Sequence, residues 1–348
     1  MSALRILIAP FAVLYTLAVY VRNWLFDIGV LSTTKVSVPV ISVGNISTGG
    51  VGKTPLVEHL ARHFREKNKS VAVISRGYKR TTTGYVVVSN GAQRCAEAAE
   101  SGDEPSQLAE KLDGVVVVVD ENRVRAAQNT IEDFKPEIIL LDDGFQHRYL
   151  HRDLNIAVVA ADELFSGSWL LPAGNRREPY SALRRADLIV LSHCSSPEVF
   201  RSASERLARW VQKPVVGMKT RPTGLRNAQT RAGVELISAV GKRVVAFSGI
   251  GNPSQFEQTL DSLSIEVAFH HRFADHHRYT AADIEMIQRS FKETRADYLV
   301  TTEKDVARLR GDLKLAESFL IKYPVNYLEI QLEIIAGEEA LMKFLTKF

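Results

Sequence analysis

The segment that most constrains the fold is the glycine-rich stretch 44–54, which reads GNISTGGVGKT. A β-branched apolar run precedes it at residues 36–43, and apolar side chains recur at helical spacing over residues 56–64. A strand, a glycine-rich turn and the start of a helix, in this order, are the context of a phosphate-binding loop. The sequence therefore predicts a nucleotide site built into an α/β fold.

The residue types of this loop suit a phosphate for physical reasons. A side chain at Gly49, Gly50 or Gly52 would keep the phosphate away from backbone N–H groups, and the helix that follows adds its positive dipole end. We expect Lys53 to reach the β- and γ-phosphates and Thr54 to bind Mg²⁺. The predicted nucleotide-binding residues are Ser47, Thr48, Gly49, Gly50, Val51, Gly52, Lys53 and Thr54.

The loop departs from the standard pattern at its first glycine position, where this chain has Ser47. The Gly-Gly-x-Gly-Lys-Thr core is kept. The departure therefore concerns the opening turn of the loop more than its contacts with phosphate.

Length and composition set wide limits. A chain of 348 residues predicts about two domains. Its net charge of +4 is too small to indicate a nucleic-acid partner, although it is compatible with an anionic substrate or membrane surface. Cys95 and Cys194 lack metal-ligand spacing, which argues against a zinc site or a disulfide framework and favours a reducing compartment.

The N-terminus carries an almost wholly apolar segment, residues 6–21, between Arg5 and Arg22. As a helix it would cover about 24 Å, less than the ~30 Å hydrocarbon core of a bilayer. No small-residue cleavage site follows, which argues against a signal peptide. A buried core helix is one interpretation. We favour a membrane-embedded or interfacial helix, with Tyr20 and Trp24 among its anchors.

Further along the chain, short Val/Ile/Leu runs alternate with helical segments. Near-continuous apolar strands of this kind are typical of a parallel sheet covered on both faces. The runs lie at residues 71–75, 115–119, 138–141, 156–160 and 188–191. The fold class predicted is a P-loop NTPase-type α/β sheet with helices on both faces, together with a second, smaller α/β domain.

The pattern changes near residue 220, where a polar stretch resembles a connecting segment. We predict an N-terminal membrane-associated helix over 1–32, a nucleotide-binding domain over 33–220 and a second α/β domain over 221–348, whose last helix could return to the first domain. Two domains around a nucleotide cleft suit a kinase, because closure excludes water.

A second nucleotide-site signature follows the apolar run 138–141, where Asp142 and Asp143 stand at the predicted strand end. Such a carboxylate organises Mg²⁺ directly or through water. The alternative is an ordinary Asp-Asp-Gly turn. Because successive side chains point in different directions, we do not expect both carboxylates to have the same role.

A hydroxyl acceptor would also need a base. Asp103 lies just before a predicted helix, where it could face a cleft or simply cap the helix. His276 and His277 fall in the second domain, and either could pair with an acid of the first domain when the domains close, although adjacent histidines are as often a surface loop. Arg123 and Arg176 lie in arginine-rich segments that suit phosphate, although surface charge is the commoner explanation.

From these residues alone, the chain is a Mg²⁺-nucleotide phosphotransferase or hydrolase with a membrane-facing helix. A P-loop switch ATPase or GTPase is an alternative, but no guanine-reading Asn-Lys-x-Asp occurs and partitioning-type ATPases usually have Lys where this chain has Thr48. A non-enzymatic nucleotide-binding adaptor would leave Asp103 and the Asp275-His276 segment without a role.

Taken together, these segments resemble one family, the tetraacyldisaccharide 4′-kinases of Gram-negative bacteria. Their order and spacing carry the resemblance, and the family tolerates a hydroxyl residue at position 47. The matching segments are 42–55, 75–78, 102–105, 141–147, 171–179, 247–253, 275–276 and 302–305.

The resemblance implies that the γ-phosphate of ATP is transferred to the 4′-hydroxyl of a tetraacyldisaccharide 1-phosphate, a lipid A precursor, to form lipid IVA. It places this reaction at the cytoplasmic face of the inner membrane. It also implies that Asp103 is the general base, assisted by His276, and that Asp142 and Asp143 serve the metal with Thr54. The further candidates for the phosphate, metal and substrate region are Arg123, Gln146, His147, Arg176 and Glu178.

Overall fold

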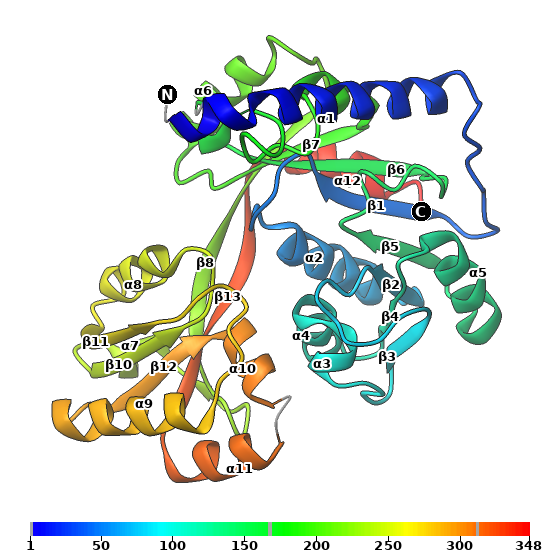
Figure 1. The fold of residues 1–348 in the computed structure, drawn as a ribbon. Helices are drawn as coiled ribbons and strands as arrows, with labels where there is room; N and C mark the ends of the chain where they lie inside the picture. Colours follow the sequence, from blue (N-terminus) through cyan, green and yellow to red (C-terminus); the bar gives the residue numbers. More distant parts are fainter. Residues whose placement is uncertain (1–2, 166–168, 311–312) are drawn as a thin grey trace.

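The computed structural model describes residues 3–165, 169–310 and 313–348, and within them the strands form one mixed sheet (Figure 1). The sheet order is β11-β10-β12-β13-β8-β7-β6-β1-β5-β2-β4-β3, with the short β9 paired to β8. Most neighbouring strands are parallel; the exceptions are β3 with β4, β8 with β13, and β8 with β9. The predicted fold class, a largely parallel α/β sheet of P-loop type, is confirmed.

Except for β3 at the edge of the sheet, the strands of the first half are buried along almost their whole length, which explains their continuous apolar runs. They are β1 (Val40–Asn45), β2 (Val71–Ser75), β3 (Val86–Asn90), β4 (Val116–Val119), β5 (Ile138–Asp142), β6 (Leu154–Ala160) and β7 (Leu188–Ser192).

Alternate residues of these strands feed two separate cores, because successive side chains point to opposite faces of a sheet. On one face, Ile41 and Leu140 pack with α2 (Lys53–Glu66) and α4 (Asp103–Lys111). On the other face, Ile139 packs with α5 (Arg123–Phe134), and neighbouring strands pack with α6 (Pro197–Leu207). The predicted helices on both faces are therefore present.

The second half of the sheet has its own cores and its own covering helices. Its strands are β10 (Arg243–Ser248), β11 (Glu266–Arg272) and β12 (Tyr298–Thr302). Its helices are α7 (Leu236–Ala239), α8 (Pro253–Ser262), α9 (Ala281–Thr294), α10 (Glu303–Arg310) and α11 (Leu313–Lys322).

Two long antiparallel strands, β8 (Val215–Asn227) and β13 (Val325–Ala336), join the two halves (Figure 1). β8 runs through residue 220, so the change of pattern in the sequence falls inside a strand and not in a loop. The domain boundaries themselves stay a prediction. After β13, α12 (Glu338–Leu345) lies against the first half, where Leu341 and Leu345 join the core under α2. The remaining short elements are β9 (Gly233–Val234), α3 (Ala98–Ser101), η1 (Asp162–Leu164) and η2 (Tyr180–Arg185).

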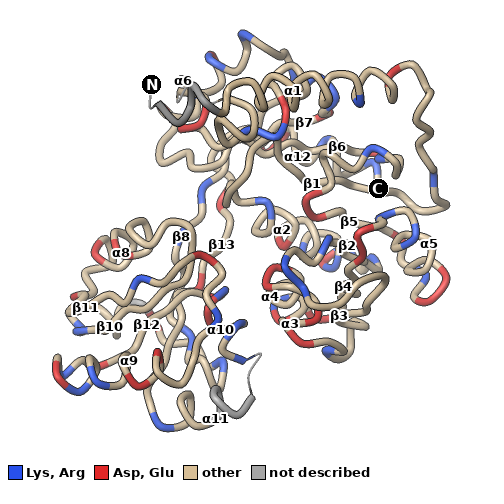
Figure 2. Tube along the Cα trace, in the orientation of Figure 1, with Lys and Arg blue, Asp and Glu red and all other residues tan. Residues whose placement is uncertain are grey.

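The N-terminal helix α1 (Ala3–Asp27) is longer than the predicted apolar segment and lies along the outside of the first half (Figure 1). Charged residues are sparse along it (Figure 2). Phe11, Leu14 and Leu17 are each at least 60% exposed, and only 6% of the apolar window within Ile8–Asp27 is buried. The interpretation as a buried core helix is therefore wrong, because most apolar side chains of α1 are exposed and only a few, such as Phe26, are buried.

Candidate active site

The predicted phosphate loop lies between β1 and α2, in the strand-loop-helix context that the sequence indicated. Gly49 and Gly52 have φ values of 115° and 87°, a region that favours glycine. Lys53 and Thr54 open α2 and are largely buried. The N-cap residue is Gly52, which has no side chain to cap this helix start. Its N–H groups are therefore left for a ligand, as anion binding at a helix N-terminus requires.

Ser47 lies at the position where the standard pattern has glycine, and the structure explains why glycine is not needed there. Its φ is not positive, and its backbone forms an antiparallel bridge with Arg176. The next residue, Thr48, donates both its N–H and its hydroxyl to the carbonyl of Asn175, at 2.7 and 3.0 Å. The loop thus opens in extended backbone held by residues 175–176.

Asp142 is the last residue of β5 and Asp143 follows it; β5 pairs with β1 so that Val43 lies opposite Asp142. Asp142 is fully buried; its Oδ2 accepts from the Ser75 hydroxyl at 3.3 Å, and its Oδ1 has no partner among the described residues. Burial, with the Glu104 charge second, raises the pKa of Asp142 to about 7.

Asp143 points elsewhere and has the opposite electrostatic environment. Its carboxylate accepts from Arg177 Nη1 at 2.9 Å and lies 3.6 Å from Lys53 Nζ. Burial would raise the pKa of Asp143, but the Lys53 and Arg177 charges outweigh it and hold the pKa below its ordinary value. The two carboxylates therefore differ in environment, and the expectation that they also differ in role stays a prediction.

The donors around this edge suit Mg²⁺ in a nucleotide site. Such an ion is commonly held by one or two carboxylates, with phosphates and waters completing its shell. Asp142, with a buried carboxylate oxygen that lacks a partner, and the Thr54 hydroxyl at the start of α2 provide oxygen ligands of this kind. Among the described residues no group of three His, Cys, Asp or Glu side chains gathers as a metal site. Phosphate oxygens would therefore complete the shell.

Glu178 makes its contacts with residues other than Asp142 and Thr54. Its carboxylate accepts from Asn23 Nδ2 at 2.8 Å, Gln146 Nε2 at 3.1 Å and Arg185 Nη2 at 3.0 Å. In this state its oxygens join α1 to the loops that border the site. A role for Glu178 as a metal ligand stays a prediction.

The remaining predicted residues supply basic groups, several with atoms that have no partner. Three of their nitrogen atoms are buried and have no hydrogen-bond partner in the part of the chain that the structure describes: Arg123 Nε, His147 Nε2 and Arg176 Nε. Burial is the main cause that lowers the pKa of Arg123 to about 10 and that of His147 to about 4, with Arg123 the next cause for His147. Gln146 donates to the carbonyl of Asn45 at 2.7 Å. The guanidinium groups of Arg123 and Arg176, each with a buried Nε that has no partner among the described residues, favour an anionic ligand.

Asp103 and His276 come from opposite halves of the sheet and meet directly. Asp103 opens α4, and its Oδ2 lies 2.8 Å from His276 Nδ1. Burial would raise the pKa of Asp103, but Arg308 and the hydrogen bonds of His276 and Arg308 hold it below its ordinary value. His277, the other candidate, lies instead 2.9 Å from Asp283 of α9.

Sequence reasoning did not single out Glu104, Arg177, Lys304 or Arg308 as site residues. Glu104 forms an ion pair with Lys304 at 3.1 Å. The charges of Lys53 and Asp143 also act on its carboxyl group, so Glu104 connects the Asp103 side of the site with the phosphate loop electrostatically. Both Glu104 and Lys304 lie in segments that carried the family resemblance, at 102–105 and 302–305. That co-occurrence is the one signal that could have found them.

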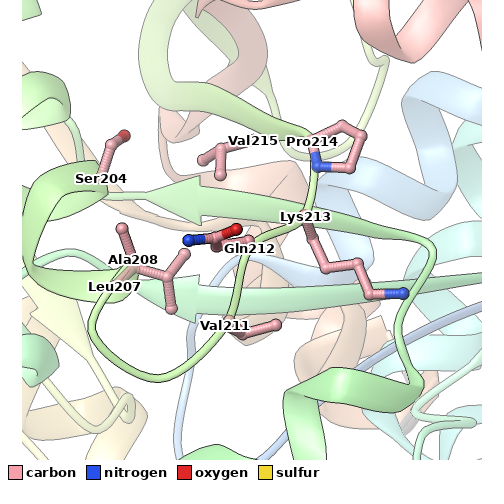
Figure 3. Close-up of a pocket in the computed structure, with 8 residues that line it drawn as sticks. All are labelled: Ser204, Leu207, Ala208, Val211, Gln212, Lys213, Pro214 and Val215. Carbon is pink, nitrogen blue, oxygen red and sulfur yellow. The ribbon is translucent and has the colours of Figure 1, made fainter.

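The structure also has a separate pocket, which lacks the residues of the candidate active site. A pocket of about 480 Å³ opens between the end of α6 and the start of β8 (Figure 3). No predicted site residue lines it; the lining residues are Ser204, Leu207, Ala208, Val211, Gln212, Lys213, Pro214 and Val215.

A glycine loop between strand and helix, Lys53 at the helix start and Asp142 at the end of the adjacent parallel strand define the class of P-loop nucleotide-binding proteins. Comparison with known proteins narrows the class. The sequence model of the Tetraacyldisaccharide-1-P 4′-kinase family matches residues 4–348, and the chain belongs to that family.

Similar curated proteins carry the name tetraacyldisaccharide 4′-kinase. The protein of Chlorobium phaeovibrioides is 38% identical over 342 residues, covering 97% of this chain and 96% of its own length. The protein of Anaeromyxobacter sp. (strain K) is 38% identical over 327 residues, covering 93% and 85%. A crystal structure of LpxK from Aquifex aeolicus in complex with ATP is 36% identical, covers 99% of both chains and has a TM-score of 0.81. Among the alternatives, the kinase is therefore favoured over the switch and the adaptor.

Proposed function

We propose that this chain transfers the γ-phosphate of ATP to the 4′-hydroxyl of a tetraacyldisaccharide 1-phosphate, forming lipid IVA, with Asp103 as general base and His276 as its partner. The observation that carries the proposal is the 2.8 Å contact between Asp103 and His276 across the two halves. Burial would raise the pKa of Glu104, the next residue of α4, but the charges of Lys304 and of Lys53 in the phosphate loop help to hold it below its ordinary value. This electrostatic contact supports a position for the base near the predicted phosphates.

In this reaction the acceptor's O–H proton passes to the Asp103 carboxylate while its oxygen forms a bond to the γ-phosphorus. The bond from that phosphorus to the bridging oxygen breaks, and ADP leaves with the electron pair. Lys53 offsets charge that develops on the phosphates, and the N–H groups at the start of α2 hold them. Mg²⁺, bound through Asp142 and Thr54, would supply further neutralisation of the phosphate charge.

The acceptor's acyl chains give a reason for the exposed helix. Among the described helices, α1 is the one with the length and composition to cross a membrane, and its apolar residues face outward. Its polar side is tied to the site: Tyr15 donates to the carbonyl of Arg177, and Arg22 donates to that of Gln146. We place α1 in the cytoplasmic face of the inner membrane, with the site against the bilayer surface.

The test is phosphate transfer from labelled ATP to a tetraacyldisaccharide 1-phosphate in detergent with Mg²⁺. Wild-type protein should form labelled lipid, and Asp103→Ala should lower kcat by about 10² to 10⁴ while ATP binding persists. A matched control is Asp283→Ala, which removes the partner of His277 and not of His276. No lipid product from wild type would overturn the kinase proposal, and near-normal turnover by Asp103→Ala would remove Asp103 from the mechanism.

A further inference from the structure

One guanidinium, that of Arg308, touches both members of the Asp103–His276 pair. Arg308 lies on α10, and its side chain is only 4% exposed. Its Nε donates to Asp103 Oδ2 at 2.7 Å, and its Nη2 lies 3.4 Å from His276 Nδ1. The planar fork of arginine can hold two such partners in a fixed relation.

Arg308 is itself held in place from the other side. Its Nη1 donates to Asp305 Oδ1 at 2.9 Å and to the carbonyl of Gly249 at 2.6 Å. Asp305 is fully buried and also accepts from the N–H of Gly249 at 3.1 Å. The carbonyl of Gly249 accepts in turn from the backbone N–H of His276 at 3.0 Å. The guanidinium therefore fixes the loop that carries His276 as well as the carboxylate that faces it.

The contacts on Asp103 are one-sided. Both Arg308 Nε and His276 Nδ1 reach Oδ2, and the structure gives Oδ1 no donor among the described residues. A carboxylate with one oxygen held by two neighbours keeps its other oxygen in a defined direction. That second oxygen is the one available to a hydroxyl group.

We propose that Arg308 is a positioning residue for phosphate transfer, which orients Asp103 and His276 so that Asp103 Oδ1 meets the acceptor hydroxyl. This inference rests on the proposed function. Arg308 acts through Asp103 and His276, with which its Nε and Nη2 make contact. Its role differs from that of an arginine that stabilises the transferred phosphate directly.

Asp103 is surrounded by both signs of charge. Of these, Arg308 is the strongest influence that favours the ionised carboxylate, followed by the hydrogen bond from His276. The other groups that face this cluster are Lys304 and Asp305 of α10, Asp275 beside His276, the neighbouring Glu104 of α4, and the ring of Tyr78, which packs edge-on against His276. Without the Arg308 charge, Asp103 would take up a proton at higher pH.

A purely structural role for Arg308 is the competing interpretation, because α10 and α4 also form other ion pairs. Arg310, two residues on, donates to Glu110 of α4 at 3.0 Å and touches neither Asp103 nor His276. Arg310→Gln therefore removes a contact between the same two helices without changing the base. It is the matched control.

The experiment compares wild type, Arg308→Gln, Arg308→Lys and Arg310→Gln by phosphate transfer between pH 4.5 and 8.5, with ATP titration and thermal unfolding on each. Arg308→Gln should lower kcat about 10- to 100-fold with the KM for ATP unchanged, and should move the acid limb of kcat/KM up by about one pH unit. Arg308→Lys should recover part of the loss, since it restores the charge but not the fork. Arg310→Gln should keep the wild-type profile.

Equal losses in Arg308→Gln and Arg310→Gln, or an acid limb that does not move in Arg308→Gln, would overturn the positioning role. So would wild-type kcat in Arg308→Gln. An Asp103→Asn variant separates this failure from failure of the proposed function. If Asp103→Asn turns over normally, the base assignment is wrong whatever Arg308 does; if it is inactive while Arg308→Gln behaves as wild type, only the present inference falls.

Discussion

The close packing of Gly44 against Phe145 offers a sharp test of how the phosphate loop and the aspartate turn are joined. Gly44 lies in β1, just before the loop, and Phe145 follows the Asp142-Asp143-Gly144 turn. A Cβ placed on Gly44 would lie 2.4 Å from the backbone N and 2.6 Å from the Cβ of Phe145. Gly44→Ala therefore forces one of the two segments to move.

The size of the effect follows from that distance. Ordinary van der Waals contact begins near 3.4 Å, so the new methyl group is about 1 Å too close, and its neighbour is backbone and not a flexible side chain. Overpacking of this kind costs about 1 to 3 kcal/mol. With ~2 to 4 °C per kcal/mol, a cost of 2 kcal/mol lowers Tm by about 4 to 8 °C. ATP affinity should fall too, because the turn that moves carries Asp142.

Gly50→Ala is the matched control. A Cβ on Gly50 meets nothing within 4 Å, so the ligand-free protein should melt at the wild-type temperature. ATP binding should nevertheless weaken at least about tenfold, because the methyl group stands between the phosphate and the backbone N–H groups. Thermal unfolding and equilibrium ATP titration on both variants are the assays. A wild-type Tm for Gly44→Ala would refute the overpacking against Phe145. Unchanged ATP affinity for Gly50→Ala would refute the close approach of phosphate to the backbone at this glycine.

Three further outcomes are expected. Leu14→Glu with Leu17→Glu, on the exposed face of α1, should abolish co-sedimentation with anionic vesicles and leave ATP binding intact; unchanged sedimentation would refute the membrane anchor. Glu303→Ala removes one of the two carboxylates that pair with Lys111 and should lower the free energy of unfolding by about 2 kcal/mol in urea titrations. This is less than the ~3 to 5 kcal/mol expected when a buried charge loses its whole partner, because Lys111 still pairs with Glu58. Because folding lowers the pKa of Asp103, the ionised carboxylate stabilises the folded protein. The loss of stability caused by Asp103→Asn should be constant from about pH 5 to 8 and should vanish as pH falls through the folded pKa. A difference in stability between wild type and Asp103→Asn that grows at acid pH would contradict this.

The first half of the fold could be predicted because its signals are local. The apolar run before Gly44, the glycines and the helical spacing after Lys53 lie within about 30 residues, and each constrains its neighbours. The strand that ends at Asp142 could be found by the same rule, and β5 does pair with β1. Ser47 appeared to be a departure because the standard pattern assumes glycine, whereas the extended backbone there accepts any residue.

Other parts of the molecule could not be predicted, because pairing between distant segments leaves no periodic trace. The polar stretch after Thr220 indicated a connection, but it pairs with β13 across more than 100 positions of sequence. Arg177 stands next to the predicted Arg176, and only the fold shows that Arg177 is the one that holds Asp143.

The role of Arg308 in the candidate active site could not be predicted for the same reason. Helix α10 carries Lys304 and Arg308 four residues apart, on one face, and α4 begins with the acids Asp103 and Glu104, so both sets of charges could be recognised in sequence. Either set alone has an ordinary explanation as solvated surface charge. Because the sheet brings the two helices together, Glu104 meets Lys304 and Asp103 meets Arg308. A charged helical face about 200 residues from a predicted base acquires a role only through that contact, which is why the effect of Arg308→Gln on the pH profile tests the arrangement of the two halves as directly as it tests the residue.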